Sequence, residues 1–153
     1  MSLRTFAFIH TMSIKEIKKE FFALRNGMLA DTLRKAGMPY GIIFGLNVPQ
    51  ISAIAKAALN DPETDRDTLA RQLWEDSNVR ESRLLACYMF DPATLSEDAA
   101  ISLATEALTR EEADMLAFRL LRNLPYAEGL ADKIPASTPV AAYSAEALRR
   151  NLQ

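Results

Sequence analysis

The sequence predicts an all-α protein, in which consecutive helix pairs stack into an α-solenoid. Apolar residues recur at helical spacing along almost the whole chain, and residues that can cap a helix mark most of the expected helix starts. Two consecutive helix pairs also share a period of 31 to 34 residues. A stack of such pairs buries the apolar faces that one pair leaves exposed. On periodicity alone, a plain helical bundle remains the alternative.

The first expected helix begins at Ser13, where Glu16 completes a capping box. Its apolar stripe continues through Leu33, and Gly37 is expected to end it. Residues 38–49 contain two glycines and two prolines, a composition typical of an ordered loop.

The later helices are separated by short polar breaks. Pro49 is expected at the first position of the next helix. Three later helices are expected to have caps, which are Asn78 together with Glu81, then Ser96 alone, then Thr109 together with Glu112. The expected helices cover residues 50–59, 68–76, 79–90, 97–108 and 110–124, with a short terminal helix at 144–153 after a linker at 135–140. Residues 69–74 align with 103–108 and residues 84–87 with 115–118, which gives the repeat period.

Composition limits the chemistry that the chain can perform. The 153 residues are 49% hydrophobic and 25% charged, enough for a domain with a core, and the net charge of −2 is unlike that of a strongly basic nucleic-acid binder. Residues 1–60 carry eight basic and three acidic groups, whereas residues 61–153 carry ten and seventeen. Any basic surface must therefore be local.

Few residues are available for metal or thiol chemistry. Cys87 is the only cysteine and His10 the only histidine, so we expect no internal disulfide, no metal site and no cofactor. The apolar neighbours of Cys87 predict a buried, inert thiol. Residues 6–12 are too short for a signal peptide and no apolar run could span a membrane, so the expected location is cytoplasmic.

Several motifs occur together in the middle of the chain. They are GLNVPQISAIAK at residues 45–56, LWE at 73–75, Arg80-Glu81, and LLA at 84–86. In this order and spacing they resemble the amino-terminal half of the AlkD family of HEAT-like repeat DNA glycosylases, over about residues 36–134. The resemblance implies an α-α superhelix of antiparallel HEAT-like helix pairs. We expect a single domain of such pairs at residues 1–134, with a linker and short helix at 135–153.

The resemblance implies excision of N3- or N7-alkylated purines from duplex DNA. The family uses an aspartate near the sugar and a tryptophan four residues before it; Asp114 matches the aspartate, but Arg110 occupies the tryptophan position. Ser52 also replaces an arginine that many relatives carry. A carboxylate can stabilise the positive charge that develops on the sugar. A neighbouring guanidinium would neutralise that carboxylate. The alternative is that Asp114 and Arg110 form an i, i+4 ion pair.

Basic residues on successive helices suggest a surface that follows the DNA backbone, since clustered lysine and arginine provide duplex affinity. The candidates are Lys56, Arg80, Arg83, Arg119 and Arg122. Repeat alignment predicts Arg83 and Asp114 side by side. The alternative is that these are solvated charges, because Glu81, Glu111 and Glu112 lie at the same helix starts.

Two functions remain open from the sequence. The first is a DNA alkylation-repair protein that binds duplex DNA. The second is a non-catalytic helical-repeat module that binds another protein or a second copy of itself.

Overall fold

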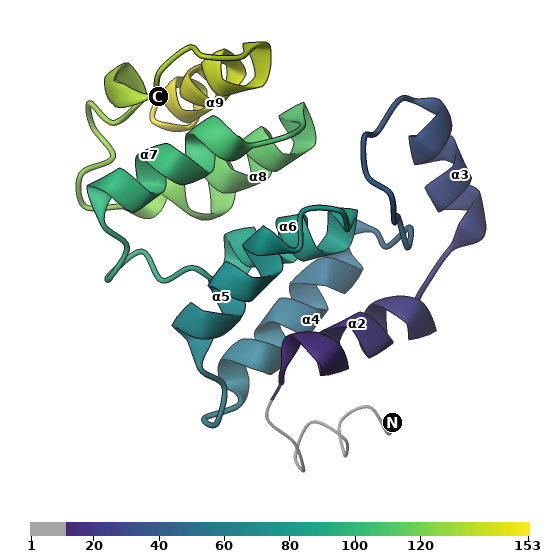
Figure 1. Ribbon diagram of the computed structural model, residues 1–153. Coiled ribbons are helices and arrows are strands. Elements are labelled where there is room, and N and C mark those ends of the chain that lie inside the picture. Colours follow the sequence, from purple (N-terminus) through teal and green to yellow (C-terminus); the bar gives the residue numbers. More distant parts are fainter. Residues whose placement is uncertain (1–11) are drawn as a thin grey trace. The chain divides into compact units, whose positions relative to one another are not determined.

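The structure is a computed structural model that describes residues 12–153, and within that range it is all-helical (Figure 1). The only β-type pairing in this part is an isolated bridge between Ile42 and Val79. The α-helices are α2 (Ile14–Ala23), α3 (Gly27–Lys35), α4 (Val48–Asn60), α5 (Arg66–Glu75), α6 (Arg80–Met89), α7 (Glu97–Glu106), α8 (Arg110–Arg119) and α9 (Pro139–Asn151), and η1 (Leu121–Asn123) and η2 (Ala131–Lys133) are 3₁₀ turns. The predicted all-α class is confirmed. The expectation for His10 lies outside the described residues.

The chain forms two compact units, one ending at Met89 and the other running from Phe90 to Gln153. In the first unit, α6 packs against both α5 and α4, and α2 contacts α5 (Figure 1). In the second unit, α9 packs against α8 and α7. The segment that the sequence assigned to a linker and terminal helix therefore contributes a 13-residue helix to the second unit.

The predicted capping residues are correct at three helix starts. Ser13 accepts a hydrogen bond from the Glu16 N–H, Ser96 caps α7 and Thr109 caps α8. Pro49 lies one position later than expected, because α4 begins at Val48. The predicted helix 110–124 ends at Arg119 and is followed by the 3₁₀ turn η1.

The prediction of one continuous helix from Ser13 to Gly37 is wrong. The Asn26 side chain accepts hydrogen bonds from the N–H groups of Met28 and Leu29, so a new helix, α3, begins at Gly27. The Asn26 N–H also donates to the Phe44 carbonyl at 2.8 Å. A contact with a loop far along the chain thus fixes the break between α2 and α3.

Asn78 and Glu81 do not cap α6 as predicted; both side chains bind the loop before α4. Asn78 accepts from the Gly41 N–H at 2.9 Å. Glu81 is fully buried, and its carboxylate accepts from the backbone N–H groups of Phe44, Gly45 and Leu46 at 3.0, 3.0 and 3.2 Å. This loop is therefore held by helix α6 rather than by its own turns.

Candidate nucleic-acid interface

The residues predicted to bind nucleic acid have different environments in the two units. In the first unit, Lys56 is exposed on α4, whereas Arg80 and Arg83 are only 3% and 4% exposed. Every residue of α6 except Tyr88 is buried, because this helix is packed against α4 and α5. Arg80 and Arg83 thus lie at the centre of the first unit's packing.

Both buried arginines bind groups of the protein itself. The Arg80 guanidinium donates to the Glu81 carboxylate at 2.8 Å and to the Leu46 carbonyl at 3.0 Å. The Arg83 guanidinium lies 3.6 Å from the centroid of the Trp74 ring and donates to the Trp74 carbonyl at 2.9 Å. This arrangement stabilises the α5–α6 pair. It leaves these two side chains little surface to offer a phosphate, and their nucleic-acid role stays an untested prediction.

In the second unit, Arg119 and Arg122 are exposed and lie beside an exposed aromatic ring. The Arg122 guanidinium is 3.9 Å and that of Arg119 5.1 Å from the centroid of Phe118, which is 43% exposed. The Arg122 Nε also donates to the Phe118 carbonyl at 2.8 Å. The two positive charges are thus gathered at the carboxyl end of α8, where the helix dipole favours cations.

Asp114 is held by the terminal helix. The Tyr143 hydroxyl donates to Asp114 Oδ1 at 2.8 Å, and Arg150 approaches the same oxygen at 3.5 Å. Arg150 also donates to the Tyr143 oxygen at 3.0 Å, so the three side chains form one hydrogen-bonded group. The Asp114 side chain remains 53% exposed and therefore reachable from solvent.

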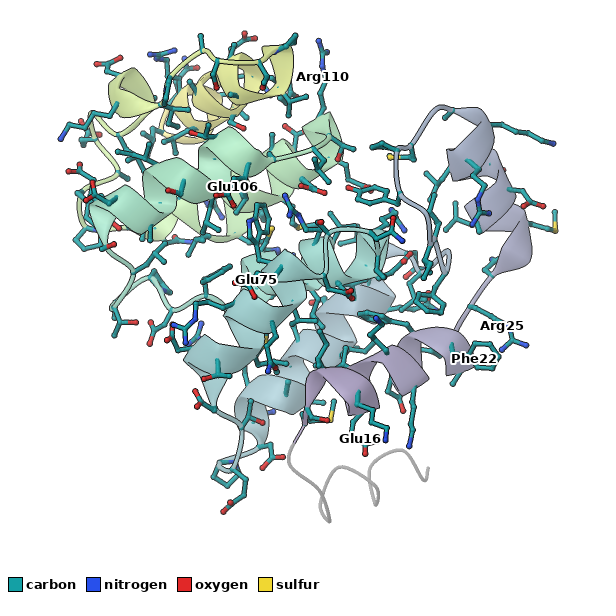
Figure 2. The ribbon with its side chains drawn as sticks, in the orientation of Figure 1. Glu16, Phe22, Arg25, Glu75, Glu106 and Arg110 are labelled. Carbon is teal, nitrogen blue, oxygen red and sulfur yellow. The ribbon has the colours of Figure 1, made fainter. Side chains whose placement is uncertain are left out.

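The alternative ion pair between Arg110 and Asp114 is wrong. The Arg110 guanidinium lies 4.8 Å from the centroid of the Tyr143 ring, and Asp114 interacts with Tyr143 and Arg150 (Figure 2 labels Arg110). Asp114 lies on the exposed side of α8, and α9 supplies its polar partners. Arg83 and Asp114 belong to different units, and their placement side by side stays a prediction.

The exposed surface of α8 and the adjoining residues of η1 and α9 carry these groups. Arg110, Asp114 and Phe118 follow at i, i+4 spacing and are all exposed, and Arg122 continues the series in η1. Eight helical residues rise about 12 Å, so arginines lie at both ends of the face with the Asp114 carboxylate between them. We call this set, with Arg119, Tyr143 and Arg150, the α8 face.

The α8 face has an excess of positive charge. Its arginines are Arg110, Arg119, Arg122 and Arg150, against the carboxylates of Asp114 and of Glu146, which lies 3.6 Å from Arg150. The hydrogen bond to Tyr143 raises the pKa of the Arg150 guanidinium above its ordinary value, and the negative charges of Asp114 and Glu146 add to this effect.

The sequence did not identify Phe118, Tyr143 or Arg150 as site residues. Tyr143 and Arg150 are seven residues apart, a spacing that places them on one side of a helix, but no motif indicated that this side meets Asp114. In the sequence, Phe118 is one more apolar residue at helical spacing, with nothing to distinguish it as a site residue. Only the packing of α9 on α8 reveals the group.

Within residues 12–153, no group of histidine, cysteine, aspartate and glutamate side chains could hold a metal ion. None of the helices in this range has the length and apolar character needed to cross a membrane. Cys87 is buried as predicted, and its thiol lies 3.5 Å from the Arg83 carbonyl.

These features define the class as an all-α protein of packed helix pairs with an arginine-rich exposed helix face. Comparison with family models gives the particular family: the one described as "DNA alkylation repair enzyme" matches residues 17–133. The match covers most of the chain, which therefore belongs to this family, and the resemblance to its AlkD-like members is confirmed at that level. No curated protein and no solved structure gives a significant match.

Proposed function

We propose that this protein acts in DNA alkylation repair, in the cytoplasm, by binding duplex DNA through the α8 face. The observation that carries the proposal is the gathering of four arginines and two aromatic rings around α8 and α9. Guanidinium groups bind phosphates well because their planar donors match phosphate oxygens, and duplex affinity depends on such local clusters rather than on net charge. Arginines spaced over about 12 Å can reach two phosphates of one strand.

We further propose that excision of N3- or N7-alkylated purines by this face is weak. Asp114 is the carboxylate expected to stabilise positive charge on the sugar. It already accepts a hydrogen bond from the Tyr143 hydroxyl and forms an ion pair with Arg150. The guanidinium groups of Arg110 and Arg150 also lie over the Tyr143 ring, so the aromatic surface nearest Asp114 carries positive charge. Such a surface repels a cationic alkylated base.

Binding is tested by the fluorescence anisotropy of a labelled, unmodified duplex over a range of salt concentrations. Arg150→Gln and Arg122→Gln should each weaken binding about fivefold to tenfold at low salt and lower the salt slope by about one. Arg149→Gln is the matched control. It removes the same charge from the neighbouring residue, which pairs with Asp132 outside the α8 face, and should change affinity less than twofold.

Equal effects of Arg149→Gln and Arg150→Gln would contradict the assignment of the α8 face. No binding of the parent protein at low salt would contradict DNA binding altogether and favour the protein-interaction module.

Excision is tested by release of methylated purine from alkylated duplex. We expect little release by the parent protein and by an Asp114→Asn variant. Efficient release that Asp114→Asn abolishes would overturn the proposal of weak excision and make Asp114 catalytic. Efficient release that persists in the Asp114→Asn variant would overturn that proposal and would also exclude Asp114 as the catalytic residue.

A further inference from the structure

The first unit carries an open groove that plays no part in the α8 face. The groove lies between the end of α2, the start of α3 and the loop at 41–44, and its volume is about 340 Å³. Phe22, Ile42 and Phe44 contribute apolar walls. We call it the Phe22 groove.

Large apolar side chains are unusually exposed at the Phe22 groove and next to it. Phe22 is 57% exposed and Ile42 is 41% exposed, and both line the groove. Met28, which follows the groove residue Gly27, is 83% exposed. Apolar side chains that gather on a surface in this way, rather than occurring singly, mark sites of interaction with another molecule.

Positive groups stand at the edge of the same groove. The Arg25 guanidinium lies 3.9 Å from the centroid of the Phe22 ring and donates a hydrogen bond to the Phe22 carbonyl at 2.8 Å, which fixes its position (Figure 2 shows the two side chains next to each other at the end of α2). Arg34 and Asp31 line the groove as well, with 3.8 Å between the Arg34 guanidinium and the Asp31 carboxylate, so the lining carries two guanidinium groups against one carboxylate. An exposed pair at this distance contributes little, so Arg34 can bind a carboxylate from outside.

We propose that the Phe22 groove docks a short segment of a partner protein that carries a large apolar side chain between acidic residues. The apolar side chain enters between Phe22, Ile42 and Phe44, and the carboxylates pair with Arg25 and Arg34. The Arg25 guanidinium already covers one face of the Phe22 ring, which reduces the aromatic surface on which a nucleic-acid base could stack. A segment that is apolar and acidic therefore matches the groove better than a nucleic acid does.

Gly27 provides a sharp test of this proposal because it lines the groove and has open space around it. A Cβ atom added to Gly27 would meet no atom within 4 Å, and its φ is not positive. Gly27 is the first residue of α3, where an acidic side chain favours the helix and a basic one does not. Gly27→Glu should therefore fold at least as well as Gly27→Lys, although it places the unfavourable charge in the groove.

The probe is an array of short synthetic peptides in which one Leu, Phe or Trp lies between Asp and Glu residues. Control arrays flank the same apolar residue with Ser or with Lys. We expect the acidic array to bind best. Gly27→Glu and Phe22→Ser should each weaken that binding at least tenfold, while Gly27→Lys should keep it within twofold of the parent protein. Circular dichroism checks that each variant is folded.

Several results would overturn the proposal. These are equal binding of the serine-flanked peptides, no binding of any acidic peptide, or undiminished binding by Gly27→Glu. Binding of a single-stranded oligonucleotide in preference to the acidic peptides would assign the groove to nucleic acid instead. The outcome is separate from the α8 face, because Gly27→Glu should leave the duplex anisotropy unchanged.

Discussion

Glu81→Gln tests how far one buried carboxylate holds the first unit together. The side chain is fully buried, and its two oxygens accept from three backbone N–H groups of the loop at 44–46 and from the Arg80 guanidinium. Glutamine has almost the same shape, so the substitution leaves no cavity. It removes the negative charge and replaces one acceptor oxygen with an NH₂ group that faces an N–H donor.

The loss can be estimated from these contacts. Hydrogen bonds to a charged group contribute about 1.5–3 kcal/mol each, and neutral ones about 0.5–1.5 kcal/mol, so two bonds that lose their charge cost roughly 2 kcal/mol together. A donor left without an acceptor costs a further 1–3 kcal/mol or so. Arg80 would also become a buried charge without its carboxylate. We therefore expect Glu81→Gln to lower the free energy of unfolding by about 3–5 kcal/mol.

The measurement is urea unfolding followed by the fluorescence of Trp74, the only tryptophan, which is 4% exposed. Glu75→Gln is the matched control, because Glu75 is exposed on α5, and it should change stability by less than about 0.5 kcal/mol. A loss below about 1 kcal/mol for Glu81→Gln, with an unchanged denaturant slope, would refute this account of the carboxylate.

Gly45 has a φ of +87° and an added Cβ would lie 2.2 Å from the Asn26 carbonyl oxygen, whereas Gly129 has a φ of +83° and open space. Gly45→Ala should therefore lower the thermal midpoint much more than Gly129→Ala, which costs only the backbone strain of about 1–2 kcal/mol; equal losses would contradict the close contact. Arg83→Lys keeps the charge but loses the planar stack on the indole, so urea unfolding should show a loss of about 2 kcal/mol or more, and an unchanged midpoint would contradict this. The hydrogen bonds that Asp65 accepts from the backbone and side chain of Thr68 hold the pKa of its carboxyl below the ordinary 3.8. Its stabilising effect is therefore full above that value and is lost as the pH falls through the lowered pKa. Asp65→Asn, which keeps a capping oxygen, should lose this acid dependence in thermal unfolding at pH about 2–6, and identical acid curves for the two proteins would count against it.

The candidate site was predictable only in part. The resemblance to the family directed attention to Asp114 and Arg110, and the sequence showed Arg119 and Arg122 as basic groups near the end of the same helix. Arg80 and Arg83 were predicted to bind nucleic acid as well, although both are buried. Periodicity could not separate these two pairs, because an arginine that stacks on a buried tryptophan and one that faces solvent have the same local spacing.

The sequence by itself determined the all-α class, the family and the starts of α2, α7 and α8. Caps such as Ser13, Ser96 and Thr109 bind an N–H only three residues ahead, so spacing along the chain is enough to reveal them. The motif in residues 45–56 likewise identified the family that the comparison then confirmed.

The tertiary structure decided which side chains meet across long stretches of chain. Glu81 binds N–H groups 35 to 37 residues before it, and Asp114 binds Tyr143 and Arg150, which follow it by 29 and 36 residues. Such contacts depend on which helix faces are buried together, and that choice is made by packing over the whole unit rather than by local hydrogen bonding. For this reason the carboxylate that resembles a catalytic residue was visible in the sequence, while the tyrosine and arginine that hold it were not.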